Sequence, residues 1–462
     1  MKRGLLMTTN NIRIDQDLCV GCGMCSRACP VGAIQGELRQ PHQIIEEKCV
    51  HCGQCVQACN IPLRDESLRA QKLKERGMLE TATEPLYAAY QMHQVQSVKD
   101  ILGKKERFTV VQCAPSVRVG IAEEFGMPIG SLTPGKLFAA LRRLGFDRVY
   151  DTNFGADITI MEEAAELVDR LTHPGEHGPL PMTTSCCPAW VKYVELEHPD
   201  LIPHLSSCKS PVGMAAALIK TYGAEQNNVD PASIYNVSVM PCTAKPFEAD
   251  RPELSDSGYQ DTDATITTRE LAQWIKDAGI DFVNLPDEEV DQLLGEYSGA
   301  GNIFGATGGV MEAALRTAYE TVTGENLPKL EFEEVRGGEG VRKASVQMGD
   351  KTVRVAVVGG LKHVNEILDQ IRQGTADFDF VEIMACTNGC ISGGGQPKPS
   401  PAQRKAAYEA RTNNMYLHDE NLPIRKCHEN PMIKKVYAEY LGAPLGEKSH
   451  HLLHTEYTSR KK

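Results

Sequence analysis

The sequence has no excess of positive charge and no long apolar run. Its 49 lysine and arginine residues are outnumbered by 61 aspartate and glutamate residues, which leaves a net charge of −12. Proteins that wrap nucleic acid or lie on an anionic membrane need a basic surface, so this balance argues against both partners. Because a run of about 18 apolar residues occurs nowhere, the sequence also predicts no transmembrane helix.

The N-terminal segment lacks the apolar stretch of a secretory signal. Lys2 and Arg3 are followed by only four apolar or small residues, 4–7, before polar residues begin. A signal needs about 7–15 apolar residues, so we expect a cytoplasmic protein. In such a reducing compartment, the sixteen cysteines of this chain are expected to bind metal rather than to form disulfides.

Eight of the sixteen cysteines form two quartets with identical spacing. The segments CVGCGMCSRAC (19–29) and CVHCGQCVQAC (49–59) share seven of eleven residues and are therefore an internal repeat. Runs of the form C-x2-C-x2-C-x3-C ligate 4Fe-4S clusters, and the fourth cysteine of each run serves the other cluster. A zinc or disulfide module is the alternative, but it would not need all eight spacings to match. The pattern predicts two 4Fe-4S clusters, one on Cys19, Cys22, Cys25 and Cys59, the other on Cys49, Cys52, Cys55 and Cys29.

Downstream of this module the sequence alternates between strand-like and helix-like segments. With 462 residues and 41% hydrophobic residues, the chain has enough apolar surface for a large core and about three domains. Polar residues 61–107 are expected to form a helical connector, and residues 135–146 and 157–171 to form helices. Strands alternating with helices predict an α/β fold of parallel sheets covered by helices, with ligand sites at the carboxyl ends of strands. The predicted strands are 108–115, 148–151, 233–240, 353–360 and 378–385.

Further cysteines lie in three separate segments, and two of these follow predicted strands. The segments are TSCCPAW (184–190), MPCTAKPFE (240–248) and EIMACTNGCISGGGQP (382–397). They predict a third iron–sulfur site, with glycines 393–395 allowing the backbone to approach a cofactor closely. Buried structural thiols are the alternative, and we favour that interpretation for Cys113, Cys208 and Cys427. The expected ligands of the third site are Cys187, Cys242, Cys386 and Cys390.

The three segments resemble, in the same order, the three signatures of FeFe-hydrogenases: TSCCP, MPCxxKxxE and ExMxCxxGCxxGGGQP. The resemblance covers nearly the whole chain, and the ending GEKSHHLLHTEY (446–457) resembles the small subunit of two-subunit members, here fused to the large one. It implies a two-cluster ferredoxin-like α+β module at 8–85, a catalytic domain at 86–400 and a small-subunit-like extension at 401–462 that packs on it. The catalytic domain would have two lobes of parallel or mixed sheets flanked by helices, with the active site between them.

The resemblance also implies an H-cluster, a 4Fe-4S cube joined through one cysteine to a diiron unit with CO, cyanide and a bridging dithiolate amine. Cys390 would be the bridging ligand, and Cys186 would stay free and exchange protons with the amine. The family's proton path corresponds here to Cys186, Glu163, Ser206 and Glu166, and it ends near Arg170 at the surface. The helix pattern alone instead favours a solvent-exposed Glu166–Arg170 ion pair, because the two residues are four positions apart.

Around the diiron unit, the resemblance implies several supporting side chains. Lys245 would donate a hydrogen bond to one cyanide, and Glu248 would compensate its charge. Ser116, after Pro115, would contact the second cyanide. An apolar wall would consist of Met240, Met384 and Phe304, although each of these residue types more often fills a core.

The favoured function is the reaction 2 H⁺ + 2 e⁻ ⇌ H₂, with electrons passing through the two N-terminal clusters. A small ferredoxin or flavodoxin is the expected electron partner, and dedicated maturation proteins are implied for the H-cluster. One alternative is a hydrogenase-like scaffold for iron–sulfur assembly without a diiron unit, which would have no reason to keep Cys186 and Lys245. Sensory or electron-bifurcating relatives need further domains or subunits, and a ferredoxin fused to an unrelated oxidoreductase is the remaining alternative.

Overall fold

The computed structural model describes residues 11–461. The N-terminal residues on which the prediction about a secretory signal depends, and residues 8–10 of the first predicted domain, lie outside this range. The N-terminal module contains two antiparallel strand pairs and two five-residue helices. Each helix begins directly after a glycine with positive φ, Gly23 at 72° and Gly53 at 70°, so the cysteine repeat is also a repeat of backbone conformation. The module comprises β1 (Ile12–Ile14), α1 (Met24–Ala28), β2 (Ile34–Gln35), β3 (Gln43–Ile44) and α2 (Gln54–Ala58).

The segment 61–107 is not the single helical connector that its polar composition predicts. Only part of the charged run forms α3 (Arg69–Glu75), and α4 (Val95–Lys104) follows after a turn-rich stretch. Between them, β4 (Ala89–Gln91) pairs antiparallel with β1 and completes the N-terminal module. Apolar residues such as Leu86 and Ala89 are buried there, so packing against the module decides the conformation over local helix propensity.

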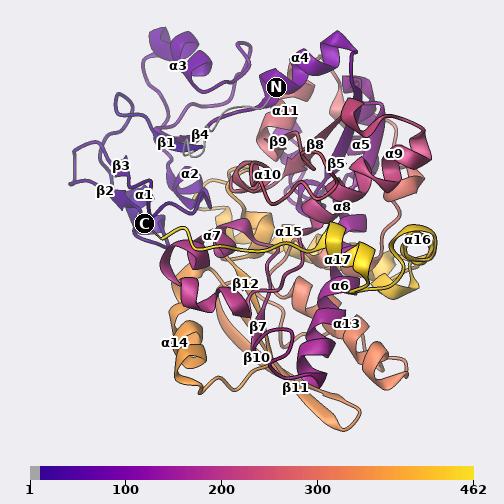
Figure 1. Ribbon diagram of the computed structural model, residues 1–462. Coiled ribbons are helices and arrows are strands. Elements are labelled where there is room, and N and C mark those ends of the chain that lie inside the picture. The colour runs from indigo at the N-terminus through magenta and orange to yellow at the C-terminus, as the bar shows by residue number, and fades with distance from the viewer. Residues whose placement is uncertain (1–10, 462) are drawn as a thin grey trace.

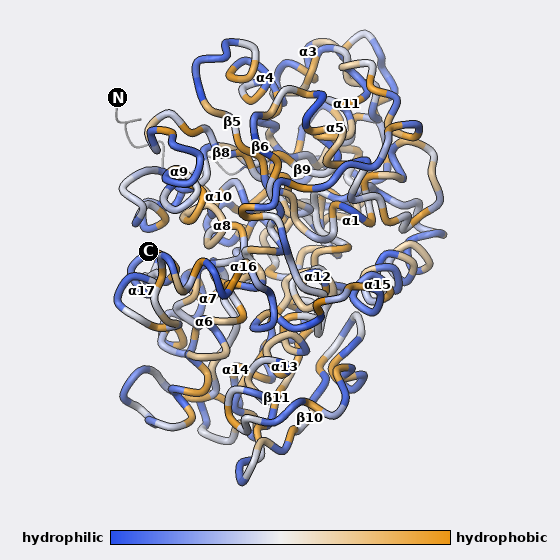
Figure 2. Tube along the Cα trace, turned by 90° about the vertical axis from the view of Figure 1, so that its right-hand side faces the viewer, coloured by the Kyte–Doolittle hydropathy of each residue, from blue (hydrophilic) through white to orange (hydrophobic). Residues whose placement is uncertain are grey.

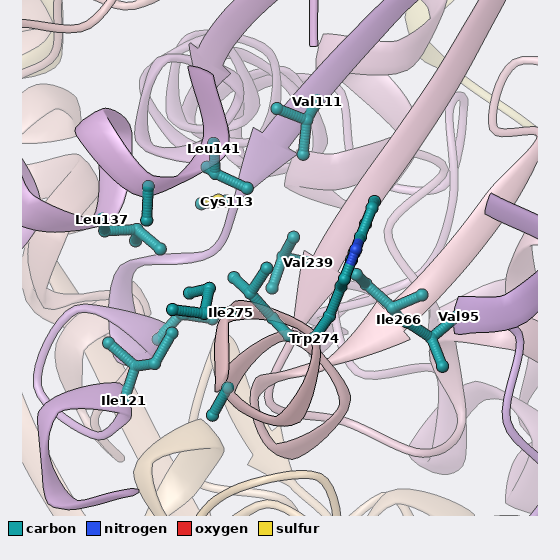
Figure 3. Packing of buried hydrophobic residues seen from close by; sticks show 14 of the residues in the cluster. Val95, Val111, Cys113, Ile121, Leu137, Leu141, Val239, Ile266, Trp274 and Ile275 are labelled. Carbon is teal, nitrogen blue, oxygen red and sulfur yellow. The ribbon is translucent and has the colours of Figure 1, made fainter. Parts of the chain in front are cut away.

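Two four-stranded sheets form the two lobes of the larger unit, the upper and lower halves of Figure 1. The upper sheet is entirely parallel, with the strand order β6-β5-β8-β9. Figure 3 shows its apolar side, where Val111, Val239 and Ile266 pack against Leu141 and Trp274 of the covering helices. The upper lobe comprises β5 (Phe108–Cys113), α5 (Pro134–Leu144), β6 (Arg148–Asp151), α8 (Pro211–Lys220), α9 (Tyr222–Asn227), β8 (Ile234–Met240), α10 (Lys245–Ala249), β9 (Ala264–Thr267) and α11 (Thr268–Asp277).

The lower sheet is mixed, with the order β10-β11-β12-β7, and only the β10–β11 hairpin is antiparallel. Along β11, Val355 and Val357 belong to one apolar cluster and Ala356 and Val358 to another, so both faces of the strand are buried. This burial explains why the strand is a continuous apolar run rather than an alternating one. The lobe comprises β7 (Met182–Thr183), α7 (Pro188–Glu197), α12 (Gly299–Ile303), α13 (Gly309–Thr323), β10 (Gly340–Met348), β11 (Lys351–Gly359), α14 (Asn365–Gln373) and β12 (Phe380–Met384).

The long helix α6 (Thr152–Thr172) starts at the end of β6 and packs against α8 and α13, so it connects the two lobes. The predicted α/β class, with parallel and mixed sheets in two lobes, is confirmed. No helix among residues 11–461 has the length and apolar character needed to cross a bilayer.

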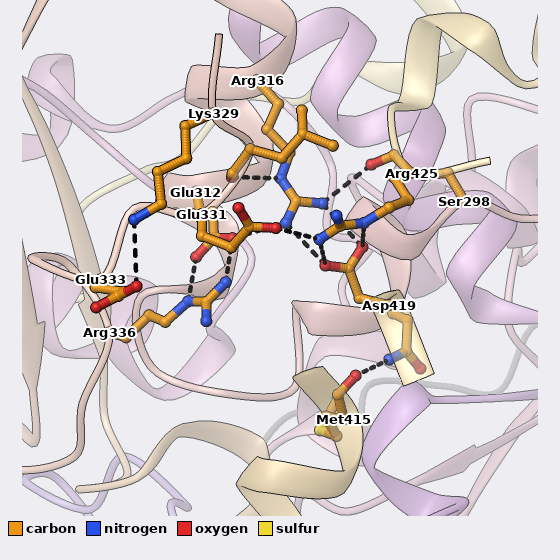
Figure 4. Close-up of polar contacts among 12 residues, drawn as sticks. Ser298, Glu312, Arg316, Lys329, Glu331, Glu333, Arg336, Met415, Asp419 and Arg425 are labelled. Carbon is orange, nitrogen blue, oxygen red and sulfur yellow. Dashed lines mark hydrogen bonds and ion pairs between the residues drawn. The ribbon is translucent and has the colours of Figure 1, made fainter. Parts of the chain in front are cut away.

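The C-terminal segment lies across both lobes as α15 (Arg404–Asn421), α16 (Pro431–Val436) and α17 (Glu447–Leu453), drawn in yellow tones in Figure 1. Figure 2 shows α15 as a largely hydrophilic helix. It is nevertheless anchored by buried charges: Asp419 accepts hydrogen bonds from Arg316 at 2.9 and 2.8 Å and from Arg425 at 2.7 Å (Figure 4). Because these groups are desolvated, the tail is held by specific ion pairs as well as by apolar packing.

Candidate functional site

Cysteine-bearing loops from both sheets meet between the two lobes. Each follows the carboxyl end of a strand: the loop after β7 carries Cys186 and Cys187, the loop after β8 carries Cys242, and the loop after β12 carries Cys386 and Cys390. Parallel strands present their carboxyl ends at one edge of a sheet, and here the two edges face each other. The sheets thus bring together cysteines that lie far apart in the sequence.

These five cysteines line one cavity between the two lobes. All five are free thiols. Burial, and next the neighbouring Cys187, raise the pKa of Cys242 to about 11. Among the predicted supporting residues, the cavity is also lined by Pro115, Ser116, Met240, Lys245, Phe304 and Met384.

The side chains that line this cavity fit an iron–sulfur cofactor that carries an additional polar group. Several thiols held together without a disulfide are the ligands that iron–sulfur clusters require. The hydroxyl of Ser116 is buried and has no hydrogen-bond partner in the described part of the chain, so it is available to a group in the cavity. The backbone N–H of Ala244 donates to the sulfur of Cys242 at 3.4 Å, a contact typical of cluster ligands.

Lys245 reaches the cavity wall as a buried, paired cation. Its ammonium group lies 2.6 Å from the carboxylate of Glu248, 2.8 Å from the hydroxyl of Ser210 and 3.4 Å from the carbonyl oxygen of Cys186. Glu248 does not line the cavity, and its contact with Lys245 keeps the buried charge compensated. Although burial opposes the charged form, this carboxylate raises the pKa of Lys245 and keeps it protonated.

A chain of polar groups leads away from Cys186. Burial raises the pKa of the Cys186 thiol, and the nearby carboxylate of Glu163 raises it further. Burial likewise raises the pKa of Glu163 to about 8, with Glu166 as the next cause, and neither Glu163 oxygen has a hydrogen-bond partner in the described chain. The hydroxyl of Ser206 donates to Glu166 at 2.7 Å, and Arg170 donates to the other Glu166 oxygen at 2.6 Å. All four groups beyond the thiol are buried.

The expectation of an exposed Glu166–Arg170 pair is wrong. Arg170 is only 3% exposed, and besides Glu166 it donates to the carbonyl oxygens of Pro179, Pro203 and Leu205. Those carbonyls come from two loops packed over α6, one before β7 and one after α7, and a helix pattern cannot reveal either. Both charged residues instead line the wall of a hollow that opens to the surface.

The two N-terminal quartets are also brought together as their spacing predicts. Cys19, Cys22, Cys25 and Cys59 line one small pocket, and two backbone amides donate to sulfurs of this group, His42 to Cys19 at 3.3 Å and Ala89 to Cys59 at 3.5 Å. Within the other quartet, the charges of Cys49 and Cys29 act on Cys52 and Cys55, which places all four close together.

The second quartet lies directly beside the interlobe cavity, since Cys52 is one of the residues that line it. The side-chain amide of Gln54, on α2, donates to the sulfur of Cys386 at 3.1 Å, and the hydroxyl of Thr243 donates to the carbonyl oxygen of His51 at 2.8 Å. No local pattern indicates the role of Gln54, because nothing in its own segment points to a partner 332 residues away.

Glycines 393–395 have a different role from the one expected. A Cβ at Gly394 would lie 2.8 Å from the Cα of Gly53, and one at Gly393 would lie 2.3 Å from the carbonyl oxygen of Pro241. These glycines therefore let chain segments pack against one another, and only Gly393 lines the cavity. Cys113, Cys208 and Cys427 are fully buried, as expected for structural thiols.

Three protein families match successive parts of the chain. The family described as "4Fe-4S dicluster domain" matches residues 11–60, "Iron only hydrogenase large subunit, C-terminal domain" matches residues 107–394, and "Iron hydrogenase small subunit" matches residues 405–460.

Individual relatives agree with the family matches. The chain is 48% identical over 390 residues to the periplasmic Fe hydrogenase large subunit of Nitratidesulfovibrio vulgaris, covering 84% of this chain and 86% of that protein. It is 44% identical to iron hydrogenase 1 of Clostridium pasteurianum over 81% of this chain, but spans only 65% of that protein. A cytosolic Fe-S cluster assembly factor of Danio rerio is more distant, at 27% identity over 83% of this chain and 95% of that factor.

The fold is likewise similar to solved hydrogenase structures. An apo FeFe-hydrogenase variant from Chlamydomonas reinhardtii superposes with a TM-score of 0.72 at 44% identity, covering 80% of this chain and 100% of that chain. The resemblance of the three cysteine segments is thereby confirmed, and the chain belongs to the iron-only, or FeFe, hydrogenase family.

Proposed function

We propose that this protein catalyses the reversible reaction 2 H⁺ + 2 e⁻ ⇌ H₂ at an H-cluster held in the interlobe cavity. As a member of its family it is an oxidoreductase that acts on H2. The observation that carries the proposal is the combination in one cavity of five thiols, a compensated lysine and the start of a buried polar chain. The 4Fe-4S cube would be held by Cys187, Cys242, Cys386 and Cys390, with Cys390 as the bridging ligand.

When bound, the H-cluster supplies the iron site at which H2 is formed or split. The chain's own residues then hold and move the protons. Cys186 would exchange a proton at its sulfur with Glu163, whose pKa of about 8 lies near working pH, as an efficient general acid–base needs. The Ser206 hydroxyl, which already donates to Glu166, would take a proton from Glu163 as it passes its own outward. Arg170 would hold Glu166 in the position that receives it.

The remaining cavity residues would orient the cofactor and exclude water. Lys245 is placed to donate a charge-assisted hydrogen bond into the cavity, and Ser116 offers a second donor from the facing loop. Met240, Met384 and Phe304 form an apolar wall that would limit the access of solvent to the iron.

Electrons would enter through the quartet farther from the cavity and pass through the nearer one. Cys19, Cys22, Cys25 and Cys59 would ligate the outer cluster, where Val20 beside Cys19 is 51% exposed. Cys49, Cys52, Cys55 and Cys29 would ligate the inner cluster, because Cys52 already borders the cavity. A small ferredoxin or flavodoxin would dock at the exposed end, and maturation proteins would deliver the diiron unit.

We further propose three domains, with residues 8–85 carrying the accessory clusters, 86–400 the H-cluster and 401–462 the small-subunit-like extension. We also propose a cytoplasmic location, where reduced thiols remain available for clusters. The scaffold alternative is less favoured, because the hydrogenase relatives are much closer in sequence than the assembly factor.

The test is the infrared spectrum of the protein matured with its diiron unit, together with H2 evolution from reduced viologen. We expect bands of metal-bound CO and cyanide and measurable gas. Matured protein that binds iron at both quartets but shows neither the bands nor the gas would overturn the hydrogenase proposal in favour of the scaffold.

A further inference from the structure

Three potential metal ligands converge at the outer end of the polar chain. Glu166 lies on α6, Cys208 lies in the loop before α8, and His454 follows α17 in the C-terminal tail. All three are buried, and one ligand atom from each lies within 4.8 Å of the others. Carboxylate oxygen, thiolate sulfur and imidazole nitrogen are the ligands that Zn²⁺ prefers, and three protein ligands leave its fourth position open.

His454 is held in the tautomer that a metal site needs. Its Nε2 lies 3.1 Å from one carboxylate oxygen of Glu162. The Glu162 carboxylate also accepts hydrogen bonds from the hydroxyl of Tyr437 and from the backbone N–H of Leu445. A carboxylate only accepts, so the imidazole proton lies on Nε2 and Nδ1 keeps its lone pair, toward which the Ser207 hydroxyl points at 2.8 Å. A carboxylate behind the non-ligating nitrogen is the usual outer support of a zinc-binding histidine.

The two oxygens of Glu166 are divided between different partners. Arg170 donates a hydrogen bond to Oε1 at 2.6 Å. Oε2 accepts one from the Ser206 hydroxyl at 2.7 Å and lies 3.7 Å from the sulfur of Cys208. A cation bound to Oε2 and to this sulfur would therefore compete directly with the hydrogen bond from Ser206. The Arg170 contact on Oε1 would not need to break.

The site is open to solvent on a negatively charged side. Glu166 and His454 line the surface hollow described above, and so do the acidic residues Asp169, Glu253, Asp256 and Glu456. Arg170 also lines the hollow, and Glu253 and Asp256 are paired with Arg251 and Lys209, but acidic side chains still outnumber basic ones there and so favour a cation. The tail histidines His450 and His451 line the same hollow and offer transient contacts for an arriving metal ion.

We propose that Glu166, Cys208 and His454 form a binding site for Zn²⁺ and that its occupancy blocks the outer end of the proton path. On binding, the Cys208 thiol loses its proton to solvent through the hollow, and its sulfur, Glu166 Oε2 and His454 Nδ1 bond to the metal. Ser206 then loses Glu166 Oε2 as its acceptor, the outward step of the path is interrupted, and turnover falls. The binding site stands on the geometry alone, whereas the effect on turnover rests on the proposed function.

The binding test uses the matured enzyme with all clusters and free Zn²⁺. Equilibrium dialysis should find one tightly bound Zn²⁺, and zinc X-ray absorption, which does not detect iron, should show one sulfur at about 2.3 Å among nitrogen and oxygen ligands. Cys208→Ala and His454→Gln should each weaken this binding at least about tenfold, and Glu162→Gln should do so by a similar factor. His451→Gln, in the same hollow but outside the triad, is the matched control and should bind as the parent does.

The turnover test measures the rate of each variant with Zn²⁺ as a fraction of that variant's own zinc-free rate. The zinc concentration for half-inhibition should rise at least about tenfold in Cys208→Ala and His454→Gln, in step with the loss of binding. Absence of a sulfur ligand, or equal Zn²⁺ binding in all four variants, would overturn the site. Tight triad-dependent binding that leaves turnover unchanged would keep the site, but it would overturn its blocking role and remove Glu166 from the proton path.

Discussion

The substitution Glu163→Gln tests the centre of the proposed proton path, because it keeps the shape of the side chain but removes its titration. In the folded protein the pKa of Glu163 is about 8, against an ordinary value of 4.5. The variant cannot exchange a proton at this position, so we expect H2 evolution to fall at least about 100-fold, the typical contribution of a general acid–base. The exposed Glu176→Gln, just beyond the end of α6, is the matched control and should keep its turnover.

The same substitution should change stability in a pH-dependent way. Since the folded-state pKa is raised, Glu163 must take up a proton on folding at any pH between 4.5 and about 8, and this cost grows with pH across that window. At about 1.4 kcal/mol per pKa unit, and with half of Glu163 ionised at pH 8, the cost is about 2 kcal/mol at pH 6 and about 4 kcal/mol at pH 8. Glutamine avoids it, but its unpaired amide in the same apolar surroundings costs about 1–3 kcal/mol at every pH.

The cost of the unpaired glutamine amide is the same at every pH, so it cancels when the stabilities at two pH values are compared. The variant should therefore gain about 2 kcal/mol over the parent between pH 6 and pH 8. Thermal unfolding followed by circular dichroism, under anaerobic conditions and at one scan rate, measures this difference at both values. A difference that stays constant or shrinks toward high pH would refute the raised pKa, and unchanged turnover would remove Glu163 from the path.

Further predictions address other parts of the structure. Cys186→Ala should retain the infrared bands of the cofactor and lose most turnover, and full activity in the alanine variant would exclude this thiol from proton exchange. Asp419→Asn should destabilise the protein by about 1.5–3 kcal/mol in thermal or denaturant unfolding, because the buried Arg316 loses its bidentate carboxylate and keeps Glu312 as its charged partner; the exposed Glu333→Gln is the control and should change little. Gln54→Leu removes a hydrogen bond to the sulfur of Cys386 and should lower the reduction potential of the cube in a redox titration, whereas an unchanged potential would show that this contact does not tune it.

Much of the site could be predicted from local sequence. Each cysteine quartet spans only eleven residues, so a single turn and helix place three of its sulfurs, and the spacing alone indicates the cofactor. The largely apolar runs at 353–360 and 378–385 are likewise strands, because a strand whose centre is buried on both faces is rich in apolar residues. The tail was predicted as an extension, but its buried ion pairs with α13 were not.

By itself, the sequence determined which cysteines stand in repeated or clustered segments, because residue type and spacing are local properties that a short segment fixes. The tertiary structure decided which environment each residue occupies. Loops packed over α6 bury Glu166 and Arg170, and the tail brings His454 to Glu162, 292 residues away. Burial and the neighbouring carboxylates set the pKa of Glu163. The burial arises from segments that are remote in sequence, and no local pattern records it.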